Sequence, residues 1–131
     1  MNDAVSDYRR VARLRRLVTS DFDALYLEVK NSPENLKTVA GFITARDKKG
    51  RYREHIFVRD MAARFFEWYA RNRGNVTPAI PEFMEILRNE PDAHIKGQII
   101  DAVKFAVCWE LLEMQREPKQ TMVRLLESKS L

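Results

Sequence analysis

Cysteine, glycine and histidine are scarce in this chain, whose 131 residues include one cysteine, four glycines and two histidines. A single cysteine cannot form an internal disulfide. This excludes a disulfide-stapled secreted scaffold and favours a reducing compartment, so we expect a cytoplasmic protein. His55, His94 and Cys108 share no short spacing and do not predict a metal site. The sequence also lacks a glycine-rich phosphate loop and a Gly-x-Ser-x-Gly turn. We therefore expect no cofactor, no small-molecule substrate and no enzymatic activity.

Long apolar runs are missing as well. No stretch approaches 18 consecutive apolar residues, and the first ten residues, MNDAVSDYRR, include acidic residues where a signal peptide has a basic start. These absences predict a protein without a membrane span or a targeting segment. The composition, 45% hydrophobic and 32% charged, is ordinary for a globular protein, and the length suits one core. We expect a single domain over residues 1–131.

Apolar residues recur at helical spacing through most of the chain, which predicts an all-α fold, a compact bundle of five or six helices. Helices are expected over residues 4–18, 21–30, 33–46, 54–73, 81–89 and 93–117, with a short amphipathic helix over 119–129 after Pro118. Thr19 or Ser20 can cap the second helix, and Asn31 can end it in a left-handed conformation. Ser32 followed by Pro33 is typical of a helix start.

The strongest helical pattern lies in residues 54–74. One arc of this helix is apolar and is expected to be buried: Phe57, Val58, Met61, Ala62, Phe65, Phe66, Trp68 and Tyr69. The opposite arc is expected to face solvent or a polar partner: Asp60, Ala63, Arg64, Glu67, Ala70 and Arg71. Asp60 with Arg64, and Glu67 with Arg71, have the spacing of favourable i,i+4 ion pairs. Gly74 can supply the left-handed residue that ends the helix.

The last long helix is apolar on nearly every side between Ile99 and Met114. Such a helix is expected at the centre of a bundle or in a subunit interface, and we expect it to pack against helix 54–73. Cys108 and Trp109 lie within this apolar run, so both are predicted to be buried.

Charge is unevenly distributed, with a net charge of +6 over residues 1–75 and −2 over residues 76–131. The asymmetry favours a polyanionic partner for the N-terminal part. It favours a protein partner, or another copy of this chain, for the C-terminal part. Three basic groups are candidate nucleic-acid contacts: Arg9, Arg13 and Arg16 on one face of the first helix, Lys48, Lys49, Arg51 and Arg53 around Tyr52, and Arg71 and Arg73 after the apolar helix. If they converge in space they form one cationic surface, and otherwise each is an ordinary solvated cluster.

Each basic group also has a purely structural interpretation. The arginine-rich face of the first helix fits phosphate contact and fits a solvated face on a docked helix. An exposed Tyr52 ring could stack on a base, but a ring folded onto the body gives the same pattern. A rival local interpretation makes residues 39–46 and 52–58 a β-hairpin about Lys49 and Gly50.

One catalytic pattern is present in residues 88–94, RNEPDAH, which resembles the Arg/Asn…His motif of the helical nucleases called HEPN. In that family one helix brings the arginine and the histidine together. Pro91 should break such a helix here, so Arg88 is expected to end one helix and His94 to open the next.

Residues from about 33 to 116 resemble the small-subunit family of type III CRISPR effector complexes. Three features carry the likeness: the apolar helix ending in FFEWYARNRG (65–74), the short helix after it, and a last helix bearing Phe105, Trp109 and Leu112. The resemblance implies a compact all-α antiviral-defence protein that lines its complex in several copies and contacts RNA without cutting it. It marks Arg71 and Arg73 as candidate backbone contacts.

Two non-enzymatic hypotheses follow. In the first, the protein is a basic helical subunit that binds RNA or single-stranded nucleic acid through phosphates within a larger complex with other protein subunits. In the second, it is a protein-interaction module, such as a phage-type inhibitor or regulator, whose basic face docks on an acidic protein surface and whose last helices self-associate.

Overall fold

The computed structural model describes residues 2–116 of the chain. Its elements are α1 (Asn2–Val18), α2 (Phe22–Val29), α3 (Pro33–Thr44), α4 (Ile56–Arg71), a 3-10 turn η1 (Thr77–Ala79), α5 (Ile80–Asn89) and α6 (Ala93–Arg116). No β-strand forms within this part of the chain, so the predicted all-α bundle is confirmed. Pro118 and the helix expected over 119–129 lie outside the described residues.

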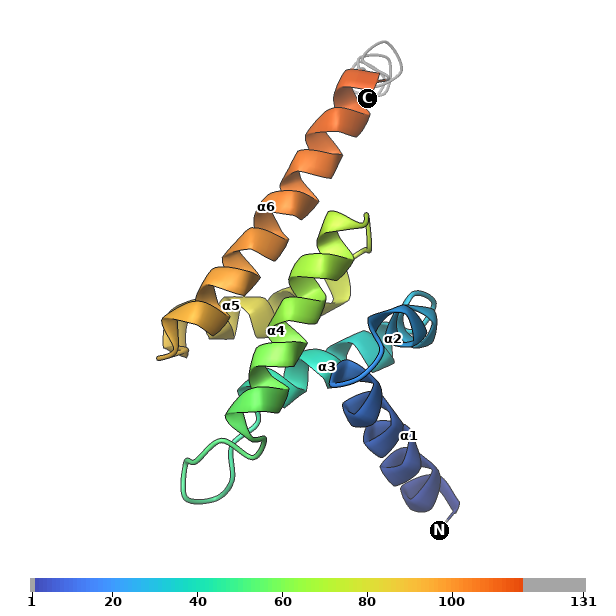
Figure 1. Cartoon of the computed structure of the whole chain (residues 1–131), viewed down its shortest axis with the longest axis vertical. Coiled ribbons are helices and arrows are strands. Elements are labelled where there is room, and N and C mark those ends of the chain that lie inside the picture. The colour runs from blue at the N-terminus through green and yellow to red at the C-terminus, as the bar shows by residue number, and fades with distance from the viewer. Residues whose placement is uncertain (1, 117–131) are drawn as a thin grey trace, which may run out of the picture.

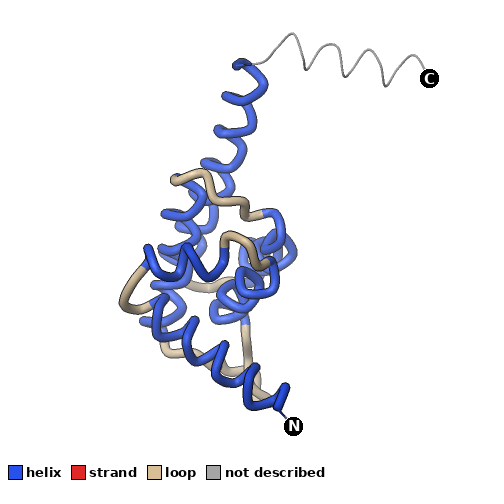
Figure 2. Tube along the Cα trace, turned by 90° about the vertical axis from the view of Figure 1, so that its right-hand side faces the viewer, coloured by secondary structure: helices blue, strands red, loops and turns tan. Residues whose placement is uncertain are grey.

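The helices form a bundle in which α4 and α6 lie side by side and run in the same general direction (Figure 1). α3 contacts α1, α2, α4, α5 and η1, so it joins the N-terminal helices to the rest. The expected packing of α4 against α6 is confirmed. The C-terminal turns of α6 extend beyond the other helices (Figure 2).

Aromatic and branched side chains fill the core as helical periodicity predicts. Phe65 and Phe66 of α4 are fully buried, and the ring of Phe65 packs on Phe22 and Tyr69 at centroid distances of 5.3 and 5.5 Å. The inward face of α3 is buried: Leu36, Val39, Ala40, Phe42 and Ile43.

Two helix ends differ from their predicted chemistry. Asp21, not Thr19 or Ser20, caps α2, and its side chain accepts a hydrogen bond from the Ala24 N–H at 3.0 Å. The hydroxyls of Thr19 and Ser20 instead lie against the end of α1, where both donate to the Arg16 carbonyl. No left-handed residue ends α2, since among residues 2–116 the only non-glycine with positive φ is Arg73. The cap formed by Ser32, with Pro33 at the first helical position, is confirmed.

The left-handed residue at the end of α4 lies one position earlier than predicted. Arg73 rather than Gly74 adopts the left-handed conformation, with φ of 66°. The Arg73 N–H donates to the Ala70 carbonyl at 3.0 Å and the Gly74 N–H to the Tyr69 carbonyl at 2.7 Å, which is a Schellman motif. Glycine is needed at 74 for space, because a Cβ there would overlap the Tyr69 ring.

The burial of the two arcs of α4 also differs in part from the prediction. Ala63 and Ala70, predicted to face solvent, are fully buried, and Phe57, predicted to be buried, is 53% exposed. The reason is that α4 has neighbours on two sides, α3 and α6, and small alanines allow a close approach on its second side. The two predicted ion pairs are confirmed, Asp60 with Arg64 at 2.8 Å and Glu67 with Arg71 at 3.5 Å.

The second half of α6 is not core. Cys108 is exposed and Trp109 is half-buried, so both burial predictions are wrong. The physical reason is that the C-terminal turns of α6 extend beyond the other described helices, so within residues 2–116 the apolar side chains of those turns have no helix to pack against. Trp109 retains one firm contact, because its Nε1–H donates to the Ala70 carbonyl at 2.9 Å.

Alkaline pH should destabilise the fold through Tyr69. Burial raises the pKa of Tyr69 above its ordinary value of 10.0, nearby Tyr26 adds to the rise, and a hydrogen bond from the Asn75 backbone acts in the opposite direction. Folded Tyr69 therefore holds its proton more tightly than unfolded Tyr69. The resulting stability is fully present below about pH 10 and is lost as the pH rises through the folded pKa.

Urea unfolding of the wild type and of Tyr69→Phe, measured at several pH values from about 8 to 11, tests this linkage. The free energy of unfolding should fall more steeply above about pH 10 in the wild type than in the phenylalanine variant. Parallel profiles for the two proteins would show that Tyr69 does not contribute to alkaline unfolding.

Candidate nucleic-acid interface

The loop between α3 and α4, residues 45–55, projects from the bundle at the N-terminal end of α4 (Figure 1). Asp47 organises this loop, because its Oδ1 accepts hydrogen bonds from the backbone N–H groups of Lys49 and Arg51 at 2.9 and 3.0 Å. Gly50 supplies the left-handed conformation in the turn, with φ of 79°. Four cationic side chains are exposed around this ordered turn: Lys48, Lys49, Arg51 and Arg53.

Tyr52 anchors the loop to the body. Its ring lies between two guanidinium groups, with centroid distances of 3.9 Å to Arg46 and 3.4 Å to Arg59. Arg46 also donates to the Tyr52 hydroxyl at 2.6 Å. The ring is therefore folded onto the body and engaged by arginines, and it does not present a free face to a base. Arg46 and Tyr52 form a single antiparallel bridge, so the β-hairpin interpretation is reduced to one residue pair.

Beneath Tyr52 lies a buried ion pair that the sequence did not predict. Arg59 and Glu90 are 3% and 7% exposed, and the guanidinium of Arg59 contacts the Glu90 carboxylate directly. The Nε–H of Arg59 donates to the Ile43 carbonyl at 3.0 Å, and the Asp92 N–H donates to Glu90 at 3.1 Å. The only signal in the sequence is a charged residue in the first turn of an apolar helix, which is too common to identify a buried pair.

A polar hollow of about 700 Å³ separates the loop from α1, and Arg15 lines it together with the loop residues 47–49 and 51–54. Arg15 donates to both oxygens of Glu54, at 2.9 and 2.8 Å, so α1 is fastened to the loop. Arg15, which flanks the first predicted group, is therefore the α1 arginine that meets the loop.

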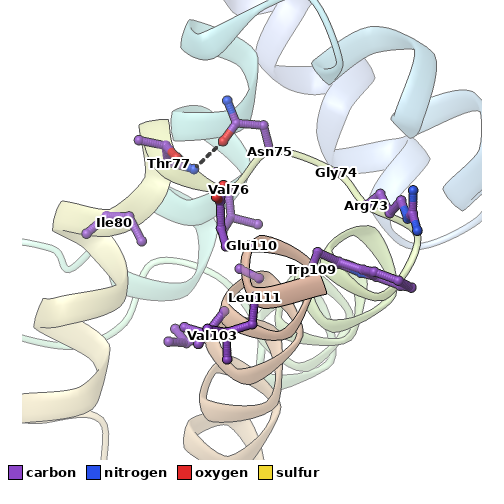
Figure 3. Close-up of a pocket in the computed structure, with 12 residues that line it drawn as sticks. Arg73, Gly74, Asn75, Val76, Thr77, Ile80, Val103, Trp109, Glu110 and Leu111 are labelled. Atoms are coloured by element: carbon purple, nitrogen blue, oxygen red, sulfur yellow. Dashed lines mark hydrogen bonds between the residues drawn. The ribbon is translucent and has the colours of Figure 1, made fainter. Parts of the chain in front are cut away.

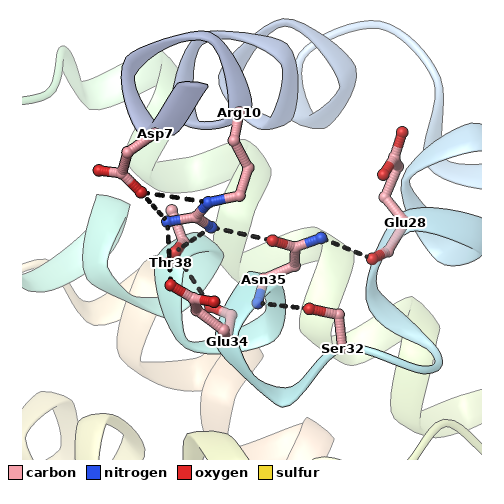
Figure 4. Close-up of polar contacts among 7 residues, drawn as sticks. All are labelled: Asp7, Arg10, Glu28, Ser32, Glu34, Asn35 and Thr38. Atoms are coloured by element: carbon pink, nitrogen blue, oxygen red, sulfur yellow. Dashed lines mark hydrogen bonds and ion pairs between the residues drawn. The ribbon is translucent and has the colours of Figure 1, made fainter. Parts of the chain in front are cut away.

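Several arginines of α1 form contacts that hold this helix against its neighbours. Arg10 donates to the side-chain oxygens of Asn35 and Thr38 on α3, each at 2.9 Å, and pairs with Asp7 at 2.8 Å (Figure 4). Arg13, one of the predicted contacts, pairs with Glu28 of α2 at 3.0 Å. The other two predicted contacts on this helix, Arg9 and Arg16, are exposed and form no ion pair with residues 2–116.

The third predicted group lies elsewhere. α4 has 16 residues, so at 1.5 Å per residue Arg71 stands about 24 Å from the loop that precedes this helix. Arg71 pairs with Glu67, and the Arg73 guanidinium lies over the Trp109 ring at 4.3 Å. The structure thus joins α1 to the loop through Arg15, shows no contact of Arg9, Arg13 or Arg16 with the loop, and places Arg71 and Arg73 at the opposite end of α4.

The histidine of the HEPN-like pattern has other neighbours. A turn at Glu90–Asp92 separates Arg88 on α5 from His94 on α6, as Pro91 predicts. The Nε2 of His94 lies 3.0 Å from Nη2 of Arg64 and 3.2 Å from Oδ1 of Asp60. Within residues 2–116, no three histidine, cysteine or carboxylate side chains are placed to share a metal ion.

None of the helices described here combines the length and hydropathy that a bilayer crossing needs. The comparisons with known proteins leave the family open, and the CRISPR small-subunit resemblance stays a prediction. No protein-family model, curated protein or solved structure matches this chain.

Proposed function

We propose that the protein is a non-catalytic subunit that binds the backbone of RNA or single-stranded nucleic acid with its basic end. The observation that carries this proposal is the ordered, projecting loop of residues 45–55, which exposes four cations beside a polar hollow. Phosphate contacts of this kind supply most of the affinity of sequence-independent binding. The proposed setting is a ribonucleoprotein complex in the cytoplasm.

Preorganisation is what distinguishes this loop from an ordinary charged turn. The Asp47 side chain accepts two hydrogen bonds from the loop backbone, and the Tyr52 ring is packed between the guanidinium groups of Arg46 and Arg59. A loop that is already ordered loses little conformational entropy when it binds, so its cations contribute more of their interaction energy to affinity. A solvated cluster whose only role is solubility does not need such an anchor.

The geometry narrows the proposed contact set. Lys48, Lys49, Arg51 and Arg53 form its centre, and the exposed Arg9 and Arg16 of α1 stay candidate contacts outside that centre. Tyr52 acts by positioning the loop, and Arg13 by holding α1 to α2. Arg71 and Arg73 fall outside the proposed surface because of their distance from the loop.

Two variants with matched charge loss test this proposal. Lys48→Gln/Lys49→Gln should weaken binding to a fluorescein-labelled poly(U) oligonucleotide and flatten the dependence of log K on log[salt] by about 0.7 for each lost phosphate contact. Arg71→Gln/Arg73→Gln removes the same charge from the far end and should leave both quantities close to wild type. The measurement is fluorescence anisotropy over a salt series, with circular dichroism confirming that both variants fold.

Equal effects of the two variants would refute a local site and would indicate attraction by net charge alone. If the wild type did not bind poly(U) at low salt, the proposed binding of nucleic acid would be refuted. That result would favour the alternative, in which the same loop docks on an acidic protein as a regulator or phage-type inhibitor does.

A further inference from the structure

Two aromatic rings are more than half exposed among the residues that the structure describes, Tyr8 on α1 at 74% and Phe57 on α4 at 53%. Tyr52, the stacking candidate that the sequence predicts, is packed between two guanidinium groups. Trp109 is half-buried, and the Arg73 guanidinium lies on its ring beside a pocket of about 400 Å³ (Figure 3). Tyr8 and Phe57 are therefore the rings that a base could reach.

The surroundings of Phe57 are unfavourable for a phosphate backbone. Phe57 lines a hollow of about 300 Å³ together with Asp60 and Asp92. Arg64 pairs with Asp60 at 2.8 Å and so offsets one of these carboxylates. His94, which also lines the hollow, adds positive charge only when it is protonated. The charge around Phe57 is therefore more negative than positive at neutral pH.

Tyr8 lies on a face of α1 that carries unpaired cations. Arg9 and Arg16 border this face, are exposed, and form no ion pair with the residues that the structure describes. Asp7 is the one α1 carboxylate whose side chain is described, and it pairs with Arg10 at 2.8 Å on the side of the helix that meets α3. An aromatic ring beside free cations is the combination found in single-stranded nucleic-acid sites, where the ring stacks on a base and the cations meet phosphates.

The face that bears Tyr8 leads to the basic loop. Tyr8 and Arg15 are seven residues apart, so their side chains emerge within about 20° of each other and about 10 Å apart along the helix. Arg15 reaches Glu54 and lines the polar hollow beside the loop, so Tyr8 projects from the same side of α1, two turns nearer its N-terminal end. The N-terminal half of α1 and the loop extend toward the same end of the long axis of the molecule (Figure 1).

We propose that Tyr8 stacks on a base of an unpaired strand whose phosphates lie on the loop. A single strand thereby gains a contact that a duplex lacks, because duplex bases are stacked on one another and offer no face to the ring. The contact tolerates any base, since every base has a π face. This inference rests on the proposed function and narrows its ligand to single-stranded nucleic acid.

Fluorescence anisotropy with three fluorescein-labelled ligands of about 12 nucleotides tests the stacking contact: single-stranded oligouridylate, an abasic strand and an RNA duplex. Tyr8→Ala should weaken oligouridylate binding by about tenfold, within the range for one lost base stack. The affinities for the abasic strand and the duplex should not change, because neither offers a base to the ring. The salt dependence of oligouridylate binding should keep its wild-type slope, since no phosphate contact is lost.

Two further variants serve as matched controls. Tyr8→Phe retains an aromatic ring and should keep oligouridylate affinity within about twofold of wild type. Phe57→Ala removes the other exposed ring and should leave all three affinities unchanged. Both replaced side chains are more than half exposed, so the variants are expected to fold, and circular dichroism verifies it.

Unchanged oligouridylate affinity in Tyr8→Ala, or an equal loss on the abasic strand, would overturn the stacking contact and leave the loop as a phosphate site. An equal loss in Phe57→Ala would overturn it as well, because the effect would then follow from removing either exposed ring. The proposed function fails in a different way. The wild type would then bind none of the three ligands at low salt, or Lys48→Gln/Lys49→Gln would leave oligouridylate affinity unchanged, and either result would refute the phosphate site together with this inference.

Discussion

Arg59→Met is expected to lower the free energy of unfolding by about 3–5 kcal/mol, because it leaves the Glu90 carboxylate buried without its partner. The cost is large since the two side chains are only 4% and 2% exposed. The change also removes the donor to the Ile43 carbonyl in the last turn of α3 and one of the two guanidinium groups on Tyr52. Urea denaturation followed by circular dichroism at 222 nm measures the loss.

The matched control is the double variant Arg59→Met/Glu90→Leu, which replaces both charges with apolar groups of similar size. It should recover at least half of the loss, because no isolated charge remains in the core. A double variant as unstable as Arg59→Met would show that the contacts of Arg59 with Ile43 and Tyr52 dominate. A single variant within about 0.5 kcal/mol of wild type would contradict the buried pair itself.

Phe65→Ala is expected to cost about 3–5 kcal/mol, the range for removing a fully buried phenylalanine. Its ring contacts those of Phe22, Phe66, Trp68 and Tyr69, so little of the resulting cavity can collapse. Trp109→Ala should cost less, about 1–2 kcal/mol, because Trp109 is half-buried and loses mainly one hydrogen bond and the stacking of Arg73. Composition alone would have ranked the two changes alike, since both remove a large aromatic from an apolar helix.

Thermal and urea unfolding of Phe65→Ala, Trp109→Ala and the wild type should be measured at two protein concentrations. A Trp109→Ala loss as large as that of Phe65→Ala would contradict the exposed position of the second half of α6. If the Trp109→Ala loss grew with protein concentration, the tryptophan would be part of an interface between copies of the chain.

Helix positions were predictable because they depend on local chemistry. The 3.6-residue repeat of apolar side chains, the Ser32-Pro33 start and the break at Pro91 act over one or two turns. The same reasoning misplaced the N-cap of α2 by one or two residues and the left-handed residue after α4 by one. At those sites neighbouring residues compete for one position, and side-chain contacts such as the Tyr69 ring on Gly74 decide between them.

The candidate site was predictable only in part. The basic residues of the loop were recognisable from their density, and the four expected to be exposed are exposed. Nothing local indicated that Tyr52 would lie between Arg46 and Arg59, or that Arg13 and Arg15 would pair with carboxylates 15 and 39 positions away. Those partners are distant in sequence, and any of several carboxylates had a suitable charge.

The sequence by itself determined that this protein is an all-α bundle with a strongly basic N-terminal half, because helical periodicity and net charge are properties of the chain alone. The tertiary structure decided which basic groups meet and which apolar surface stays open. It places Arg71 and Arg73 at the far end of α4 from the loop, and within residues 2–116 it leaves Val107 and Leu111 about half exposed. An apolar helix face carries the same signature in sequence whether it packs inside the chain or awaits a partner. The difference depends on where each neighbouring helix ends, and here α6 extends beyond the last turn of α4.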